Sequence, residues 1–137
     1  MKTYKSKISI GLVLFLLLLF GFIEYEVLSE SFNVYSVLIF ISPLIFIAYT
    51  FTSIKYIIND TTLIDKAGFS MNEKIDITSI RKIEATNNII SSPAASFDRL
   101  EIFYNTYDSI IISPEHKHQF LSNLTQINPN IEIKLNK

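Results

Sequence analysis

Two long stretches without a charged side chain occupy most of the first 54 residues, and they constrain the fold more than any other feature. The first stretch runs from Ile8 to Ile23 and the second from Ser31 to Ile54. A helix needs about 20 apolar residues to cross the hydrocarbon layer of a membrane. The second stretch is this long, and the stems of Lys5 and Lys7 can extend the shorter first one to the headgroups. We therefore predict that residues 1–54 form an anchor of two transmembrane helices.

A cleaved signal peptide is the alternative interpretation of the first stretch, because a lysine-bearing start followed by apolar residues is typical of both. A cleavage site requires small residues at alternate positions, whereas this stretch ends in Gly21, Phe22, Ile23 and Glu24. A second apolar stretch also follows soon afterwards. Both features favour an uncleaved hairpin.

Pro43 lies inside the second stretch and is expected to bend the helix without preventing the crossing. Proline removes one backbone donor, so the carbonyl four residues earlier loses its partner. In a membrane, a nearby hydroxyl such as that of Ser42 can bind that carbonyl.

The positions of the basic residues predict the orientation of the hairpin. Lys2, Lys5 and Lys7 precede the first stretch and Lys55 follows the second, while the segment from Glu24 to Asn33 has three glutamates and no basic residue. Short loops rich in lysine and arginine stay in the cytoplasm. We therefore expect a multi-pass protein of the cell membrane with both termini in the cytoplasm.

Residues 55–137 are expected to form one cytoplasmic domain. The formal net charge of the chain is -1, and the acidic and basic residues of this half are interspersed. Nucleic-acid binding is therefore not expected, because it usually requires a basic face. The chain has no cysteine, which agrees with a reduced compartment.

Short strands are predicted through most of this half, because apolar and polar residues alternate between turn-forming clusters. The turns are expected at residues 59–62, 66–68 and 105–109. Leu100, Ile102 and Tyr104 alternate with polar neighbours before the last of these turns, which indicates a hairpin with Ile110–Ile112. A short terminal strand is expected around Ile133.

One helix is predicted near the C-terminus. Ser113 is expected to be its N-cap and Pro114 its first residue, where the missing amide donor costs nothing. The helix is expected to end at Asn128 and Pro129. Its apolar face is formed by Phe120, Leu121, Leu124 and Ile127.

The soluble half resembles a bacterial pleckstrin-homology-like family, the family of YyaB-like proteins that includes the sublancin immunity protein. The most specific matching parts are the run from Ser91 to Leu100 and the Ser113–Pro114 pair before the helix. The remaining matching residues are Tyr56, Ile58, Asp60, Leu63, Ile75, Ile77, Ile80, Ile83, Ile112, Phe120, Leu121, Leu124, Asn128, Pro129 and Ile131. The resemblance implies a mainly β, partly open barrel that a C-terminal helix caps.

Ligand binding is predicted at Ser91, Ser92, Ser96 and Arg99. Hydroxyls and backbone donors in this segment can hold a headgroup or a peptide carboxylate. The alternative is a connecting loop whose hydroxyls bind their own backbone. Asp98 next to Arg99 is expected to have a stabilising role, because adjacent strand residues point to opposite faces.

Neither a metal site nor catalysis is predicted, and no cofactor is expected. His116 and His118 point about 200° apart on a helix, so they cannot readily share a metal ion and are expected to be exposed. Arg81 and Lys82 can contact phosphates if their strand faces the membrane, and solvated positions are the alternative. The chain has no phosphate-binding glycine loop and no nucleophile motif.

Two functions remain open. The first is a non-catalytic binding module at the inner leaflet, with the bilayer as one partner and a membrane protein, peptide or lipid as another. Bacteriocin immunity or envelope protection is one version of it. The second is a structural subunit whose helices pack into a larger membrane complex. Gly11 and Gly21 are not at the four-residue spacing typical of helix interfaces, which favours the first function.

Overall fold

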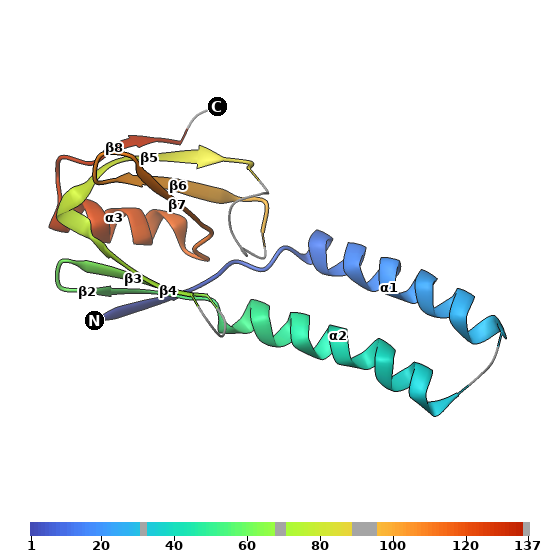
Figure 1. The fold of residues 1–137 in the computed structure, drawn as a ribbon. Coiled ribbons are helices and arrows are strands. Elements are labelled where there is room, and N and C mark those ends of the chain that lie inside the picture. Colours follow the sequence, from blue (N-terminus) through green and yellow to red (C-terminus); the bar gives the residue numbers. More distant parts are fainter. Residues whose placement is uncertain (31–32, 68–70, 89–95, 136–137) are drawn as a thin grey trace.

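The structure is a computed structural model that describes residues 1–30, 33–67, 71–88 and 96–135. A hairpin of two long helices projects from one end of a β domain, and the two helices lie side by side (Figure 1). They are α1 (Ile10–Glu30) and α2 (Val34–Ser53). Both are long and apolar enough to cross a membrane, by length and composition. The two predicted helices are therefore present.

The bounds of α1 differ from the first uncharged stretch. The helix begins at Ile10 and continues past Glu24 and Glu26, which the prediction placed in the connecting segment. Glutamate is a good helix former, so the backbone stays helical after the apolar residues end. Helix α2 continues through Pro43, and the Ser42 hydroxyl donates to the Ile39 carbonyl at 3.4 Å, which is the contact expected for it.

The β domain consists of two four-stranded sheets. The first has the order β1-β2-β3-β4 and is antiparallel throughout, and the second has the order β7-β6-β5-β8. Strand β8 pairs with β5 in the parallel direction. The strands are β1 (Lys2–Lys5), β2 (Lys55–Asn59), β3 (Thr62–Ala67), β4 (Met71–Asp76), β5 (Ile80–Thr86), β6 (Arg99–Tyr104), β7 (Asp108–Ile112) and β8 (Glu132–Lys134), with a 3-10 turn η1 (Ile77–Ser79) between β4 and β5.

Strand β1 corrects the expected division of the chain at residue 55. Residues Lys2–Lys5 were assigned to the anchor, but they pair with β2 and place Tyr4 in the core at 7% exposure. Lys5 therefore belongs to a sheet and does not extend α1. This strand was hard to predict, because β1 is only four residues long and Tyr4 is its single apolar side chain.

The segment after β1 joins the two sheets. The amide of Ser6 donates to the carbonyl of Ile54 at 3.2 Å, beside β2. On its other side, the amide of Lys7 donates to the carbonyl of Ser113 at 2.7 Å, beyond the end of β7. Ser6 and Pro114 form an antiparallel bridge. These contacts link the two sheets along one seam, and the barrel stays partly open.

Helix α3 (Lys117–Ile127) lies between the two sheets (Figure 1). Phe120, Leu121 and Leu124 are buried on its predicted face, and the ring centroids of Phe120 and Tyr4 are 5.3 Å apart. The helix ends at Asn128 as predicted, and the side chain of Asn128 donates to the carbonyls of Ile77 and Ile80. The predicted fold class, a helical hairpin followed by a mainly β barrel with a helical cap, is confirmed.

The predicted start of α3 is wrong. The N-cap position is occupied by His116 and not by Ser113. Ser113 is fully buried, where its amide donates to the Tyr56 hydroxyl at 3.0 Å and its own hydroxyl donates to the carbonyl of Asp98. The Ser113–Pro114 pair resembles a helix start, but here it extends β7 to meet Ser6.

Candidate functional site

The predicted ligand residues are divided between described and undescribed parts of the chain. Ser91 and Ser92 lie outside the described residues. Ser96 and Arg99 are buried, at 2% and 4% exposure. The Ser96 hydroxyl accepts from the amide of Asp98 at 3.2 Å, which is the local hydroxyl-to-backbone contact of the loop alternative. Ligand binding by these residues stays a prediction.

Arg99 connects the two ends of the segment between β5 and β6. Its Nε donates to the carbonyl of Ser96 at 2.6 Å, and its Nη1 donates to the carbonyl of Asn88 at 3.1 Å. Burial lowers the pKa of the guanidinium from its usual value. The two contacts hold the start of β6 close to the end of β5, so Arg99 has a structural role whatever else it binds.

Asp98 has the stabilising contacts that were predicted for it. Its carboxylate pairs with the ammonium groups of Lys117 and Lys7, the latter at 3.1 Å. The hydrogen bond from Lys117 is the main cause of a lowered pKa for Asp98. The start of α3, the segment after β1 and the start of β6 therefore meet at this carboxylate.

The other basic and imidazole groups also have local partners or face solvent. The Arg81 guanidinium donates to the carbonyl of Thr106 at 3.0 Å, and the Lys82 ammonium pairs with Glu84. His116 and His118 are exposed, as predicted. No group of three potential metal ligands occurs in the part of the chain that the structure describes.

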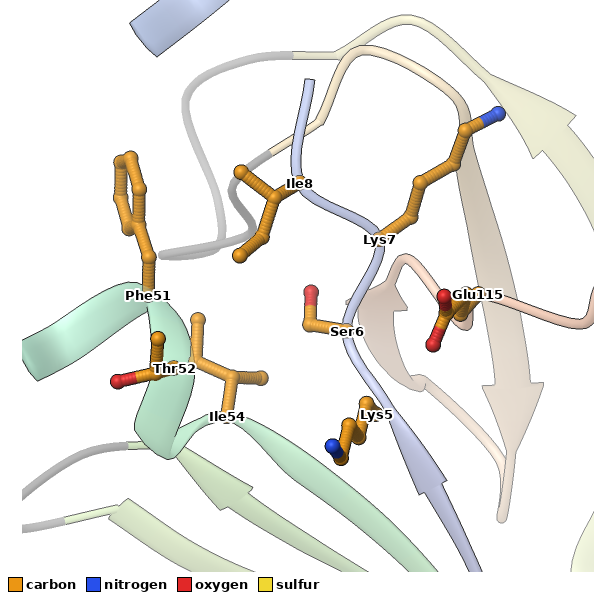
Figure 2. A pocket seen from close by; sticks show the side chains of 8 residues that line it. All are labelled: Lys5, Ser6, Lys7, Ile8, Phe51, Thr52, Ile54 and Glu115. Carbon is orange, nitrogen blue, oxygen red and sulfur yellow. The ribbon is translucent and has the colours of Figure 1, made fainter. Parts of the chain in front are cut away.

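A cavity of about 480 Å³ lies where the helical hairpin joins the β domain (Figure 2). One wall is the segment after β1 and the other is the end of α2. The ammonium groups of Lys5 and Lys7 point in different directions in this view. The lining residues are Lys5, Ser6, Lys7, Ile8, Phe51, Thr52, Ile54 and Glu115.

An apolar groove of about 370 Å³ continues from this cavity between the two helices. The two share Ile8, Phe51 and Thr52. The remaining lining residues of the groove are Val13, Leu16, Leu17, Leu44, Ile47 and Ala48. A cavity with charged residues in its lining thus adjoins an apolar groove between the two helices.

Three lysines form a row across the first sheet at its end nearest the helices. Lys5 is paired with Lys55, and Lys55 is paired with Lys66. Directly paired residues in antiparallel strands point to the same face. All three lysines are exposed, and the flanking row of Tyr4, Tyr56 and Asp65 points into the core. Sequence reasoning missed this lysine row, because it depends on the register of a strand that was not predicted.

Asp65 lies next to this row on the opposite face of the sheet. It is 8% exposed, and its Oδ1 has no hydrogen-bond partner. Burial and the nearby charge of Glu73, its cross-strand neighbour, raise the pKa of Asp65 to about 6. The Tyr104 hydroxyl donates to Glu73, and burial is the largest cause of the raised pKa of Tyr104.

Comparison with protein-family models gives one match, to the model described as "Bacterial PH domain", over residues 54–128. The match covers more than half of the chain. It extends from the end of α2 to the residue that caps α3, so β1 and both long helices lie outside it. Neither the comparison with curated proteins nor the comparison with solved structures gives a match.

Proposed function

Because this chain belongs to the bacterial PH domain family, we propose that it is a membrane-anchored, non-catalytic binding module that acts at the inner leaflet of the cell membrane. The domain and the two apolar helices fit a membrane-associated binding module. Its partner, in this proposal, is a protein or peptide that is itself in or at the membrane. PH folds carry many unrelated functions, so the proposal depends on how this domain is placed.

The observation that carries the proposal is that the helical hairpin is inserted between two paired strands. The chain leaves β1 into α1 and returns from α2 directly into β2, and β1 and β2 are hydrogen-bonded neighbours. Both ends of the hairpin are thus fixed to one sheet. The domain cannot move far from the bilayer, and β1 and β2 must lie on the same side of it.

Such a placement favours a membrane-bound partner. Tethering raises the effective concentration of the domain at the membrane surface, so a weak intrinsic affinity is sufficient there. A partner dissolved in the cytoplasm gains nothing from it. Immunity to a membrane-active bacteriocin is one form of this proposed function.

The test compares the full chain with an untethered variant. Residues 8–52 are replaced by a short Asn-Gly turn, so that Lys7 and Ser53 flank a two-residue connection and Ser6 stays opposite Ile54. This variant keeps β1 and its pairing with β2. Both forms are expressed in a sensitive strain that is then challenged with membrane-active bacteriocins, and both are crosslinked to their neighbours in cells.

Protection and specific crosslinks by the full chain alone are expected. Equal activity of a folded untethered variant would show that tethering is not required. Failure to protect against any peptide, together with crosslinks that map to the helices, would favour the second function.

The second function, a structural subunit of a larger membrane complex, is favoured by one observation. No residue of α2 is buried within the described chain. The apolar surface of α2 is therefore available to lipid or to helices of another protein.

A further inference from the structure

We infer that the junction between the helical hairpin and the β domain binds one anionic glycerophospholipid of the surrounding bilayer. Its headgroup phosphate lies on the lysine row of Lys5, Lys55 and Lys66, and one acyl chain lies in the groove between α1 and α2. The inference rests on the proposed membrane anchoring. It adds a ligand class and a site that lies largely outside the segment matched to the family.

An anionic partner would stabilise the lysine row. Side chains directly opposite each other on neighbouring strands have Cβ atoms about 5 Å apart, and like charges at such positions are destabilising. None of the three ammonium groups pairs with an acid in the described ranges, whereas Lys7, Lys82, Lys117 and Lys134 all do. A phosphate next to the row removes the mutual repulsion of three cations.

The position of the row selects a lipid phosphate over other anions. Lys55 follows α2 after the single residue Ile54, so with an extended rise of about 3.3 Å per residue it stays close to the end of the helix. Lys5 and Lys66 are each paired with Lys55, so all three lie at the same level of the sheet. When α2 spans the bilayer, the row lies at the depth of the headgroups.

The charges that face the cavity support the same assignment. Lys7 is paired with Asp98 and its ammonium is directed away from Phe51 and Thr52 (Figure 2), so Lys5 is the cation left on this side. Glu115 is the one acid among the lining residues. The positive charge of the lysine row therefore lies on the side of Lys55 and Lys66, away from Glu115.

The apolar groove gives the site its preference for a whole lipid over free phosphate. It begins at Ile8, Phe51 and Thr52, which also line the cavity next to Lys5. A lipid at this position places its polar end in the cavity and its hydrocarbon chain among apolar side chains. The acyl chain is already out of water in the bilayer, so the groove contributes van der Waals packing along the chain, which inorganic phosphate cannot supply.

The test uses the full chain in nanodiscs, either of phosphatidylcholine alone or of equal parts phosphatidylcholine and phosphatidylglycerol. Native mass spectrometry counts the lipids that stay bound, and the midpoint of thermal unfolding is followed by circular dichroism. One variant carries Lys5→Gln, Lys55→Gln and Lys66→Gln. The matched control carries Lys82→Gln, Lys117→Gln and Lys134→Gln, an equal change in net charge. Inorganic phosphate is added to the phosphatidylcholine nanodiscs as a separate arm.

We expect the wild-type chain and the control to retain one phosphatidylglycerol and to unfold at a higher temperature in its presence. Each lysine near an anionic surface favours the anionic lipid, so the row variant should lose selectivity by at least about tenfold. Ala48→Phe, which fills the groove, should also weaken retention.

Equal retention of both lipids by the wild type, or unchanged selectivity in the row variant, would overturn the inference. Stabilisation by inorganic phosphate alone, or full retention in a folded Ala48→Phe variant, would disprove the role of the acyl chain. These readouts use no partner and no bacteriocin. A failure of the lipid site is therefore distinguishable from a failure of the proposed binding function.

Discussion

At the scale of single residues, Asp65 places a carboxylate in the interior of the β domain with one oxygen unsatisfied. A charged carboxylate in such a place opposes folding, because it gives up hydration without a compensating contact. Its pKa of about 6, against the usual 3.8, corresponds to about 3 kcal/mol of unfavourable free energy when the group is ionised. This cost depends on pH and can be measured.

We predict that Asp65→Asn raises the free energy of unfolding by about 3 kcal/mol at pH about 8 and leaves it unchanged below pH about 4. The folded state holds the Asp65 proton more tightly than the unfolded state, so wild-type stability falls as pH rises through about 6. Urea unfolding of the untethered variant across this range measures the difference. Asp76→Asn is the control of opposite sign, because the Thr78 contacts lower the pKa of Asp76. A difference for Asp65→Asn that does not change with pH would contradict the prediction.

Tyr4 is the second residue with a measurable consequence. Its ring packs edge-on against Phe120, and its hydroxyl accepts a hydrogen bond from the Asn123 side chain. Tyr4→Ala is expected to lower the free energy of unfolding by about 3 kcal/mol or more, through the cavity it leaves. The neighbouring exposed Thr3 provides the control, and Thr3→Ala should change stability little. Equal effects of the two substitutions would place Tyr4 outside the core.

At the scale of elements, alternation and turn chemistry were sufficient to predict the hairpin of β6 and β7. The turns after β2 and β6 have Asp60 and Asn105 at positive φ, which short polar side chains tolerate. The start of α3 was not predictable, because Ser113 and Pro114 are equally suited to a helix start and to a strand end. Here the pair ends a strand because Ser6, more than a hundred positions earlier in the chain, pairs with Pro114.

Strand β1 leads to a prediction about the isolated domain. The sequence alone suggests that residues 55–137 fold independently, but this fragment lacks the edge strand that carries Tyr4 and that joins the two sheets. We expect the fragment to be markedly less stable than the untethered variant that retains β1. Urea unfolding of both, followed by circular dichroism, compares them. Equal midpoints would show that β1 contributes nothing to the domain.

At the scale of the whole molecule, the pairing of β1 with β2 makes the topology testable, because the strands can meet only on one side of the membrane. Reporters fused at Lys7 and at Lys137 should both be cytoplasmic, and a cysteine in place of Ser29 should be labelled from outside intact cells. Protection of that cysteine, or an external C-terminal reporter, would contradict the hairpin. A reporter at Lys7 interrupts the seam, so a second fusion before Met1 serves as its control.

Only part of the candidate site could be predicted from the sequence. The lysines near the helix ends could be identified without coordinates, and they predicted the orientation. Their side-by-side arrangement on one face could not be identified from the sequence, because it depends on the strand register that pairs Lys5 with Lys55. The cavity is likewise formed by segments that the sequence keeps apart, the residues after β1 and the end of α2.

The insertion of the hairpin between paired strands also orders events during synthesis. β1 leaves the ribosome first, yet its partner β2 follows only after both helices have been made. Lys2 finds its hydrogen-bond partner Asn123 later still, 121 residues along the chain. In the proposed membrane topology, β1 and β2 of the full chain reach the same side of the bilayer only after both helices have inserted. In this topology, a chain that inserted one helix would leave Tyr4 and β2 on opposite sides of the membrane, so the core of its β domain would lack the Tyr4 side chain.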